Sequence, residues 1–175
     1  IKWVDLSKNT ELIHLHVGTN FLTSLDVTNN TKLKKLYINR NPILEIDLSK
    51  CPDLEWLYYH DCTELKTLDL SKNHKLTYVQ GSFSYTLESL NVSNNPALEF
   101  LDCGYSLMTS LDISSCTALK YIYCAYSKLQ SLDVSKNTAL EELNCYANEI
   151  TSLDLSKNTA LTSVSCFENR MSSLD

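Results

Sequence analysis

Glycine is scarce in this chain, with three residues among 175. The scarcity matters because an aspartate recurs in almost every repeating unit and could suggest a ladder of calcium ions. Calcium-binding solenoid turns use glycine-rich nonapeptides, and each ion needs six to eight oxygen ligands. The sequence shows neither feature, so we expect a solvated convex face and no metal. The aspartate column comprises Asp5, Asp26, Asp47, Asp69, Asp112, Asp133, Asp154 and Asp175, with Asn91 in the one gap.

The sequence also lacks any Cys-x-x-Cys pair, although it contains seven cysteines. Four of them recur at the period of the repeat, which explains them as members of one repeated core position. A free cysteine in such a position behaves as a small buried hydrophobe. We therefore expect seven free thiols rather than a zinc site or a disulfide framework. The four periodic residues are Cys103, Cys124, Cys145 and Cys166.

No apolar run is long enough to span a bilayer, and no signal peptide is visible. The net charge of -6 leaves no concentrated basic face, which nucleic acid or an anionic membrane would require. We expect neither nucleic acid as a partner nor membrane insertion by this segment. Both ends of the chain fall inside repeating units, so we expect the segment to be excised from a longer protein that carries any targeting signal.

Catalytic motifs are missing as well. His14 and His16 share one strand face, and His60 lies two strands away. Two histidines supply too few ligands for a closed zinc site, and no motif marks a nucleophile beside them. We expect exposed strand histidines, no catalytic residues, no cofactor and no enzymatic activity.

What the chain does contain is a repeat, seen most clearly in residues 132–173 as two successive copies of one 21-residue unit. The frame that runs from Leu140 to Ile150 matches the leucine-rich-repeat pattern LxxLxLxxN/CxL. A unit of this length is too short for a long helix. We therefore predict parallel strands on a concave face, with extended return segments or short strands and turns and little or no α-helix. Residues 1–175 should form a single domain of about eight units of 21 or 22 residues.

Two units are one residue longer than the others, at residues 62–65 and 84–87. We expect each insertion to make a bulging turn beside the working surface. In the inward column, Tyr59 should lie next to Gly81, whose missing side chain makes room for the ring. Two columns rich in asparagine should supply hydrogen bonds to buried turn backbone.

The outward strand positions are rich in aromatic residues. Of the two tryptophans, ten tyrosines and four phenylalanines, twelve fall on this face, and Tyr59 is the one that occupies an inward strand position. Strand propensity alone would place aromatic residues on both faces. We predict a ligand-binding surface on the concave face that comprises Tyr37, Trp56, Tyr58, Tyr78, Phe83, Phe100, Asp102, Tyr105, Tyr121, Tyr123, Tyr126 and Tyr146. Its centre should be a ridge about 15 Å long at the spacing of neighbouring strands, made by Trp56, Tyr78, Phe100 and Tyr121.

The pattern LxxLxCxxNxLxxLDLSxN covers nearly the whole chain. It resembles the 21-residue, cysteine-containing class of bacterial leucine-rich repeats, as in Bacteroidetes surface proteins. The resemblance implies a leucine-rich-repeat solenoid of the right-handed β/α superhelix class. It also implies a secreted or cell-surface recognition module of a bacterium, comparable to internalin-like adhesins that engage partners with the concave sheet.

Three functions remain open. Protein recognition is favoured because Tyr and Trp are enriched at the hot spots of interfaces. Carbohydrate recognition is the alternative, since Gln80, Asp102 and Asn144 interleave with the aromatic residues. A structural spacer in a larger adhesin is the third, and the aromatic face counts against it because a spacer should have a polar concave face.

Overall fold

The computed structural model describes residues 1–172, and within them it contains ten short strands and no helix. That part of the chain accordingly has no helix of the length and apolarity needed to cross a bilayer. Each strand is short because a turn-forming corner follows within a few residues of its end. The strands are β1 (His14–His16), β2 (Lys35–Tyr37), β3 (Trp56–Tyr58), β4 (Thr67–Asp69), β5 (Tyr78–Gln80), β6 (Ser89–Asn91), β7 (Phe100–Asp102), β8 (Tyr121–Tyr123), β9 (Glu142–Asn144) and β10 (Ser163–Ser165).

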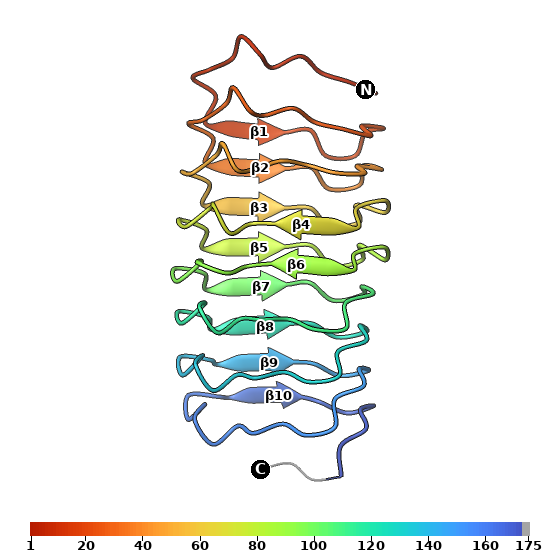
Figure 1. Ribbon diagram of the computed structural model, residues 1–175, viewed down its shortest axis with the longest axis vertical. Helices are drawn as coiled ribbons and strands as arrows, with labels where there is room; N and C mark the ends of the chain where they lie inside the picture. Colours follow the sequence, from red (N-terminus) through yellow and green to blue (C-terminus); the bar gives the residue numbers. More distant parts are fainter. Residues whose placement is uncertain (173–175) are drawn as a thin grey trace.

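Eight of the strands form one parallel sheet, in the order β1-β2-β3-β5-β7-β8-β9-β10. The register is constant, so equivalent positions of successive units lie side by side: Leu57, for example, pairs with Leu36 on one side and with Val79 on the other. Figure 1 shows the strands stacked like rungs along the long axis. The predicted parallel sheet with extended return segments is therefore confirmed.

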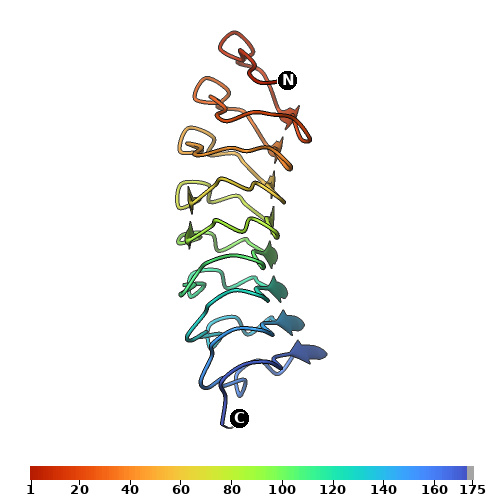
Figure 2. The ribbon, with the colours of Figure 1, turned by 90° about the vertical axis from the view of Figure 1, so that its right-hand side faces the viewer.

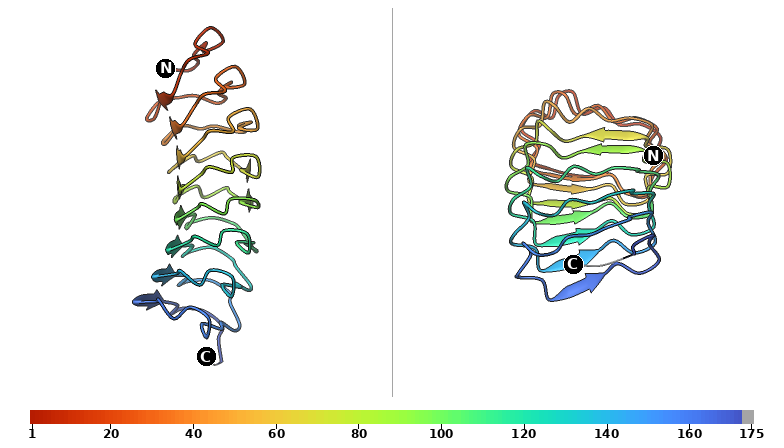
Figure 3. Two further views of the ribbon diagram at one scale, coloured as in Figure 1. Left: turned by 90° about the vertical axis from the view of Figure 1, so that its left-hand side faces the viewer. Right: turned by 60° about the horizontal axis from the view of Figure 1, so that its bottom comes forward.

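The stack is gently curved. In Figure 2 the column of strands bends so that the outer face of the sheet lies on the inside of the curve, and the return segments lie on the outside. Figure 3 shows the same curvature from the opposite side and, in its second view, the turns lying behind one another as flattened rings. The outer face of the sheet is thus the concave face of the solenoid.

The core lies between the sheet and the return segments. In each strand from β1 to β9 of the large sheet, the middle residue is buried and the two flanking residues are more exposed. This alternation is what the geometry of a strand dictates, and it confirms the predicted assignment of inward and outward positions. Leu48, Leu70 and Val92 close the core from the return side.

One inward column shows how the core stays close-packed. It runs from Val17 and Ile38 through Tyr59 and Gly81 to the cysteine column, and Tyr59 is completely buried. A Cβ atom added at Gly81 would lie 1.8 Å from Cζ of the Tyr59 ring. Glycine at this position therefore makes room for the ring, as predicted.

The two asparagine columns bind the corners of successive turns together. The Asn41 Nδ2 donates to the carbonyl oxygens of Ile38 in its own turn and Val17 in the preceding turn, both at 2.9 Å. On the return side, Asn137 Nδ2 donates to the carbonyl oxygens of Ile113 and Cys116, at 3.1 and 2.8 Å. The Asn41 bonds satisfy buried carbonyl groups to which no backbone N–H donates, and the Asn137 bonds add a second donor to carbonyl groups that already accept turn bonds from the N–H groups of Cys116 and Leu119. The predicted structural role of both columns is confirmed.

The two insertions build a regular corner rather than the bulging turn that the sequence suggested. After each insertion, the corner is closed by a backbone bond, from Leu65 N to Cys62 O and from Leu87 N to Ser84 O. This is the bonding pattern of the corners at the other end of the units, where Leu76 N bonds to Asn73 O. The extra residue also lets β4 and β6 pair as a two-stranded parallel sheet on the return side, and Figure 1 shows both strands there.

The aspartate column has a local structural role that its spacing did not reveal. Asp133 Oδ1 accepts a hydrogen bond from the backbone N–H of Ser135 at 2.8 Å, and Asn91 makes the same bond to Ser93 at 3.0 Å. An Asp or Asn side chain that bonds the backbone two residues on forms an Asx turn. Hydrogen bonds from the residue two positions on lower the pKa of the carboxyl group, chiefly from the Ser135 N–H for Asp133 and from the Ser156 hydroxyl for Asp154. Asp175, the last member of the predicted column, lies outside the described residues.

Candidate binding surface

The predicted ridge is present on the outer face of the large sheet. Trp56, Tyr78, Phe100 and Tyr121 are direct neighbours across β3, β5, β7 and β8. The rings of Trp56 and Tyr78 stack with centroids 3.7 Å apart, and those of Tyr78 and Phe100 stack at 4.3 Å. Tyr121 is tilted by 42° against Phe100, with 6.4 Å between the centroids. We call these four side chains the first ladder.

Further contacts hold three of the four rings of the first ladder. The Tyr78 hydroxyl donates to Gln80 Oε1 at 2.7 Å, and the Tyr121 hydroxyl donates to Glu141 Oε2 at 3.0 Å. At the other end, Lys35 Nζ lies 5.8 Å from the centroid of the Trp56 ring, which is within cation–π distance. The rings are therefore held in fixed orientations, with little side-chain entropy left to lose on binding.

A second, longer ladder lies at the carboxyl ends of the strands. Its rings are in contact from Phe83 through Tyr105 and Tyr126 to Tyr146 and Phe167, with centroid separations of 4.2 to 4.7 Å. We call these five side chains the second ladder. Its continuity was not predicted, because the last two residues come from a neighbouring column of the repeat. Phe167 was also absent from the predicted set.

The backbone under the second ladder is unusual. Phe83, Tyr105 and Tyr126 have φ angles of 62°, 55° and 52°. Bulky residues rarely adopt this left-handed conformation, which costs roughly 1–2 kcal/mol per residue. The corner imposes the conformation in every unit, from Thr19 to Glu168, and no glycine occupies the position in any of them. The backbone conformation therefore does not explain why three of these positions hold aromatic residues.

One insertion contributes to the second ladder. Tyr85, in the inserted corner at residues 84–87, packs edge-on against Phe83 and Tyr105, at 6.0 and 6.3 Å between centroids. Tyr85 is 53% exposed. The insertion was expected to lie beside the binding surface, but Tyr85 was not among the residues predicted for that surface.

The remaining aromatic residues occupy the strip between the two ladders. Tyr37 contacts both His16 and Tyr58, at 5.1 and 6.2 Å between centroids, and Tyr123 contacts Phe100 at 5.5 Å. Asp102 lies in the same strip and is partly buried. All twelve residues of the predicted set therefore lie on one face, and they are partly exposed or, for Tyr126, exposed.

Two hollows lie on this face. One, of about 400 Å³, follows the first ladder and is lined by Trp56, Tyr78, Phe100 and Tyr121 together with Thr77 and Glu99. The other, of about 210 Å³, lies around Asp102 between the second ladder and Tyr123. Both are shallow and partly apolar.

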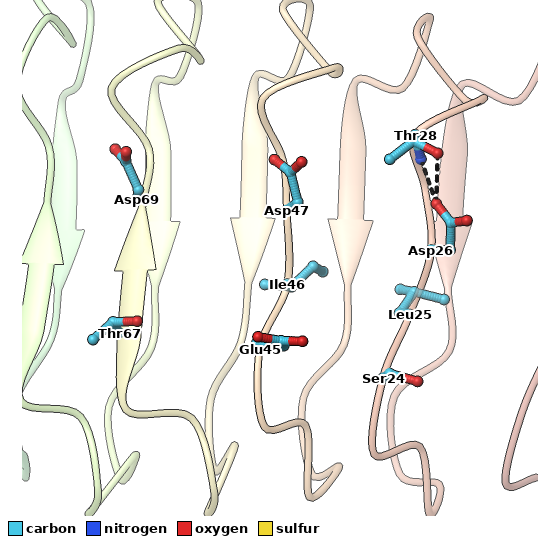
Figure 4. A pocket seen from close by; sticks show the side chains of 9 residues that line it. All are labelled: Ser24, Leu25, Asp26, Thr28, Glu45, Ile46, Asp47, Thr67 and Asp69. Carbon is cyan, nitrogen blue, oxygen red and sulfur yellow. Dashed lines mark hydrogen bonds between the residues drawn. The ribbon is translucent and has the colours of Figure 1, made fainter.

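A larger hollow, of about 520 Å³, lies on the return side among Asp26, Asp47, Asp69 and Glu45. Figure 4 shows the aspartates spaced along successive turns rather than converging on one point. Asp26 already accepts bonds from the backbone and the hydroxyl of Thr28, at 2.9 and 2.7 Å. Among residues 1–172, no three His, Cys, Asp or Glu side chains are grouped closely enough to hold a metal ion. The recurrence of aspartate in this column is explained by the hydrogen bonds that its carboxylates accept in the turns.

The cysteines are core residues. All seven are free and, apart from Cys166, they are buried. Burial raises the pKa of the Cys62 and Cys145 thiols to about 12, and of the Cys51 thiol to about 11. A thiol with such a pKa is almost entirely protonated at neutral pH and is a poor nucleophile and metal ligand.

The histidines contact aromatic and hydroxyl groups. His60 Nδ1 lies 3.2 Å from the Ser82 hydroxyl and its ring stacks on Tyr58 at 5.8 Å, while His14 is exposed.

No protein-family model matches the chain, and no curated protein matches it. Solved structures do match. The functional domain of InlJ from Listeria monocytogenes, which includes a cysteine ladder, has a TM-score of 0.92 and 34% sequence identity over 99% of this chain. The chain spans 38% of the length of that InlJ chain.

Two further structures share the fold at low identity. Internalin C2 from Listeria monocytogenes has a TM-score of 0.61 and 17% identity, over 95% of this chain and 76% of its own. Toll, in the Toll–Spatzle complex from Drosophila, has a TM-score of 0.78 and 14% identity, over 95% of this chain and 26% of its own. The chain is thus a leucine-rich-repeat solenoid, and its structural neighbours include the bacterial internalins. The predicted 21-residue cysteine class and the Bacteroidetes origin stay predictions.

Proposed function

We propose that this leucine-rich-repeat solenoid is a non-enzymatic recognition module that binds a protein partner through the aromatic outer face of its large sheet. The observation that carries the proposal is the first ladder, whose rings form a continuous, partly exposed stack at the middle of that face. Trp and Tyr are the residues most enriched at interface hot spots, and such hot spots cluster near the centre of an interface.

The fold supports a recognition role. The Toll structure is a complex with Spatzle, so a solenoid of this architecture can hold a protein ligand. The likeness to InlJ and internalin C2 of Listeria supports a secreted or cell-surface location on a bacterium. The absence of a concentrated basic face argues against nucleic acid as the partner.

Carbohydrate is the alternative ligand. Sugars bind to aromatic platforms flanked by polar groups, and Asp102 and Asn144 line the hollow beside Tyr105 and Tyr123. Protein is favoured because the first ladder, at the centre of the face, presents stacked Trp and Tyr rings, the residue types most enriched at interface hot spots. A spacer role is disfavoured because a spacer should have a polar concave face, whereas this face carries two ladders of partly exposed rings.

The test is a binding screen of the wild-type chain against host and bacterial surface proteins and, side by side, a glycan array. Trp56→Ala and Tyr121→Ala are then measured against the ligand that the screen returns. Truncation at the centre of an interface commonly costs 2 kcal/mol or more, so each variant should bind at least about thirtyfold more weakly. The matched control is Trp3→Ala, because Trp3 is an exposed tryptophan that precedes the large sheet, in a return segment.

Stability separates loss of binding from loss of folding. Trp56→Ala removes one stacked pair, worth about 0.5–1.5 kcal/mol, whereas Leu57→Ala removes a fully buried side chain and should cost about 2–5 kcal/mol. Thermal melts of both variants measure this difference. Wild-type affinity in Trp56→Ala and Tyr121→Ala, or hits on the glycan array alone, would refute protein recognition by this face.

A further inference from the structure

The hollow of about 210 Å³ around Asp102 is formed by a run of small residues. The position that follows the inward column holds Ser82, Gly104 and Ala125 in three successive turns, and all three are buried. The same position holds His60 in the turn before them and Tyr146 in the turn after. The small side chains therefore leave a recess in the sheet surface, with the larger ring of Tyr146 at one end.

Aromatic rings form the walls of the recess. Phe83 and Tyr105 of the second ladder stand on one side, with their rings stacked at 4.2 Å and 14°, and Tyr123 stands on the other. Tyr146 lies at the end. The faces and edges of four rings therefore surround a volume smaller than the 300–1,000 Å³ of sites for drug-sized molecules. The recess has the size of a single side chain.

Asp102 is the ionisable group in the recess. It sits at the end of β7 with its side chain partly buried, and it accepts a long hydrogen bond of 3.4 Å from the backbone N–H of Gly104. Burial raises the pKa of Asp102, against the opposing effects of hydrogen bonds from Ser82 and Gly104 and of the nearby His60. Desolvation thus outweighs the stabilisation that its neighbours provide.

Within residues 1–172, the six ion pairs include none with Asp102. A carboxylate withdrawn from water is normally paired with a cation. Within those residues no lysine or arginine is paired with Asp102, whose neighbours are the hydrogen-bond donors Ser82 and Gly104 and the imidazole of His60.

The charge of the surrounding face indicates which chemical group the recess would bind. From β5 to β10, the outward positions of the large sheet carry three carboxylates and neither lysine nor arginine. The carboxylates are Asp102, Glu142 and Glu168. The same face already pairs a cation with an aromatic ring at its other end, where Lys35 lies over Trp56. Aromatic walls and a desolvated carboxylate are together complementary to a cation with an apolar stem.

We propose that the recess between the second ladder and Tyr123 is a socket for a basic side chain of the partner protein, with Asp102 as the counter-charge. The inference rests on the proposed role of this face in protein recognition. Arginine fits best, because its planar guanidinium stacks on aromatic rings and donates two parallel hydrogen bonds to a carboxylate.

The test uses small probes, so that it does not depend on identifying the partner. N-acetyl-arginine amide, N-acetyl-glutamine amide and methyl glucoside are each titrated into the ¹⁵N-labelled chain, and the amide resonances of Gly104 and Ala125 are followed. The arginine probe should shift both resonances saturably and bind at least tenfold more tightly than the neutral glutamine probe. Methyl glucoside represents the carbohydrate alternative.

Three variants locate the interaction. Asp102→Asn keeps the shape and removes the charge, and Tyr105→Leu keeps the charge and removes a ring. Each variant should bind the arginine probe at least tenfold more weakly than the wild type does. Glu168→Gln removes one exposed carboxylate of the same face outside the recess, and it should leave the affinity within about twofold, since exposed charges are screened by solvent. If the Asp102→Asn variant does not fold, the affinity of the Tyr105→Leu variant for the arginine probe is the deciding measurement.

The socket is refuted if the arginine probe causes no saturable shift at Gly104 and Ala125. It is equally refuted if methyl glucoside or the glutamine probe binds as well as the arginine probe, or if Asp102→Asn binds arginine as the wild type does. Failure of the proposed function has a different signature. In that case the ladder variants leave partner binding unchanged, while the arginine probe still occupies the recess.

Discussion

Tyr59 and Gly81 show how a single position is adapted in a repeat. The other members of their column are Val, Ile and Cys. In two successive turns, Tyr59 and Gly81 replace two medium-sized side chains by one large ring and no side chain. The Tyr59 hydroxyl is buried and has no hydrogen-bond partner among the described residues. The ring is therefore retained by packing alone, and the two residues should be energetically coupled.

The coupling can be measured with Gly81→Cys, which copies the residue that stands in the next turn at Cys103. Its Cβ would overlap the Tyr59 ring, so we expect a loss of about 1–3 kcal/mol in the free energy of unfolding, as overpacked cores show. Tyr59→Ile in the same chain restores the pattern of the other turns and should recover most of the loss. Urea unfolding of the two single variants and the double variant gives the coupling energy. Additive effects would mean that the ring and the glycine are independent.

At the scale of the element, the return segments depend on Asx turns. Asp5, Asp26, Asp47, Asp112, Asp133 and Asp154 have lowered pKa values because the hydroxyl and the backbone N–H two residues on donate to the carboxylate. A carboxyl group whose pKa is lower in the folded state than in the unfolded state stabilises the fold above the unfolded pKa. That contribution is lost as the pH falls through the folded pKa. The chain should therefore lose stability in acid, below about pH 4.

The melting temperature should fall less steeply with decreasing pH when three of these residues are replaced together by Asp112→Asn, Asp133→Asn and Asp154→Asn. Asparagine keeps the turn, as Asn91 does at the same position, but does not titrate. Melting temperatures measured between pH 7 and pH 2.5 give the slope. The matched control replaces the same three residues by Ala, which removes the turn bond and should lower the melting temperature at neutral pH as well. Equal acid slopes in the wild type and the Asn variant would contradict this account.

The strands also show which parts of the fold could be predicted from the sequence. The strand register and the two faces follow from the periodicity, because Leu57 and its equivalents alternate with outward residues in every unit. Short strands on the return side were among the predictions, but the location of β4 and β6 could not be predicted, because it depends on where one inserted residue lets two return segments align. The second ladder was also missed, since Tyr126 and Tyr146 meet across two columns and only the path of the corner brings their rings within 4.7 Å.

At the scale of the whole molecule, the repeat is uniform in its core and specialised on one face. The first and second ladders run along the axis of the solenoid, so a ligand would lie across several units at once. Charge is graded along that face, with His14, Lys35 and Arg40 near one end and Asp102, Glu142 and Glu168 toward the other. Such a gradient can orient a partner and increase its rate of association. We expect the partner to cover the middle of this face.

The most direct test uses the two tryptophans of the chain, Trp3 and Trp56. Trp3→Phe leaves Trp56, in the first ladder, as the only tryptophan, and Trp56→Phe leaves Trp3, in a return segment. Quenching of tryptophan fluorescence by acrylamide is measured for both variants, with and without the partner returned by the binding screen. The account predicts that the partner shields Trp56 from the quencher and leaves Trp3 unchanged. Shielding of Trp3 with no change at Trp56 would contradict it and place the binding surface on the return side.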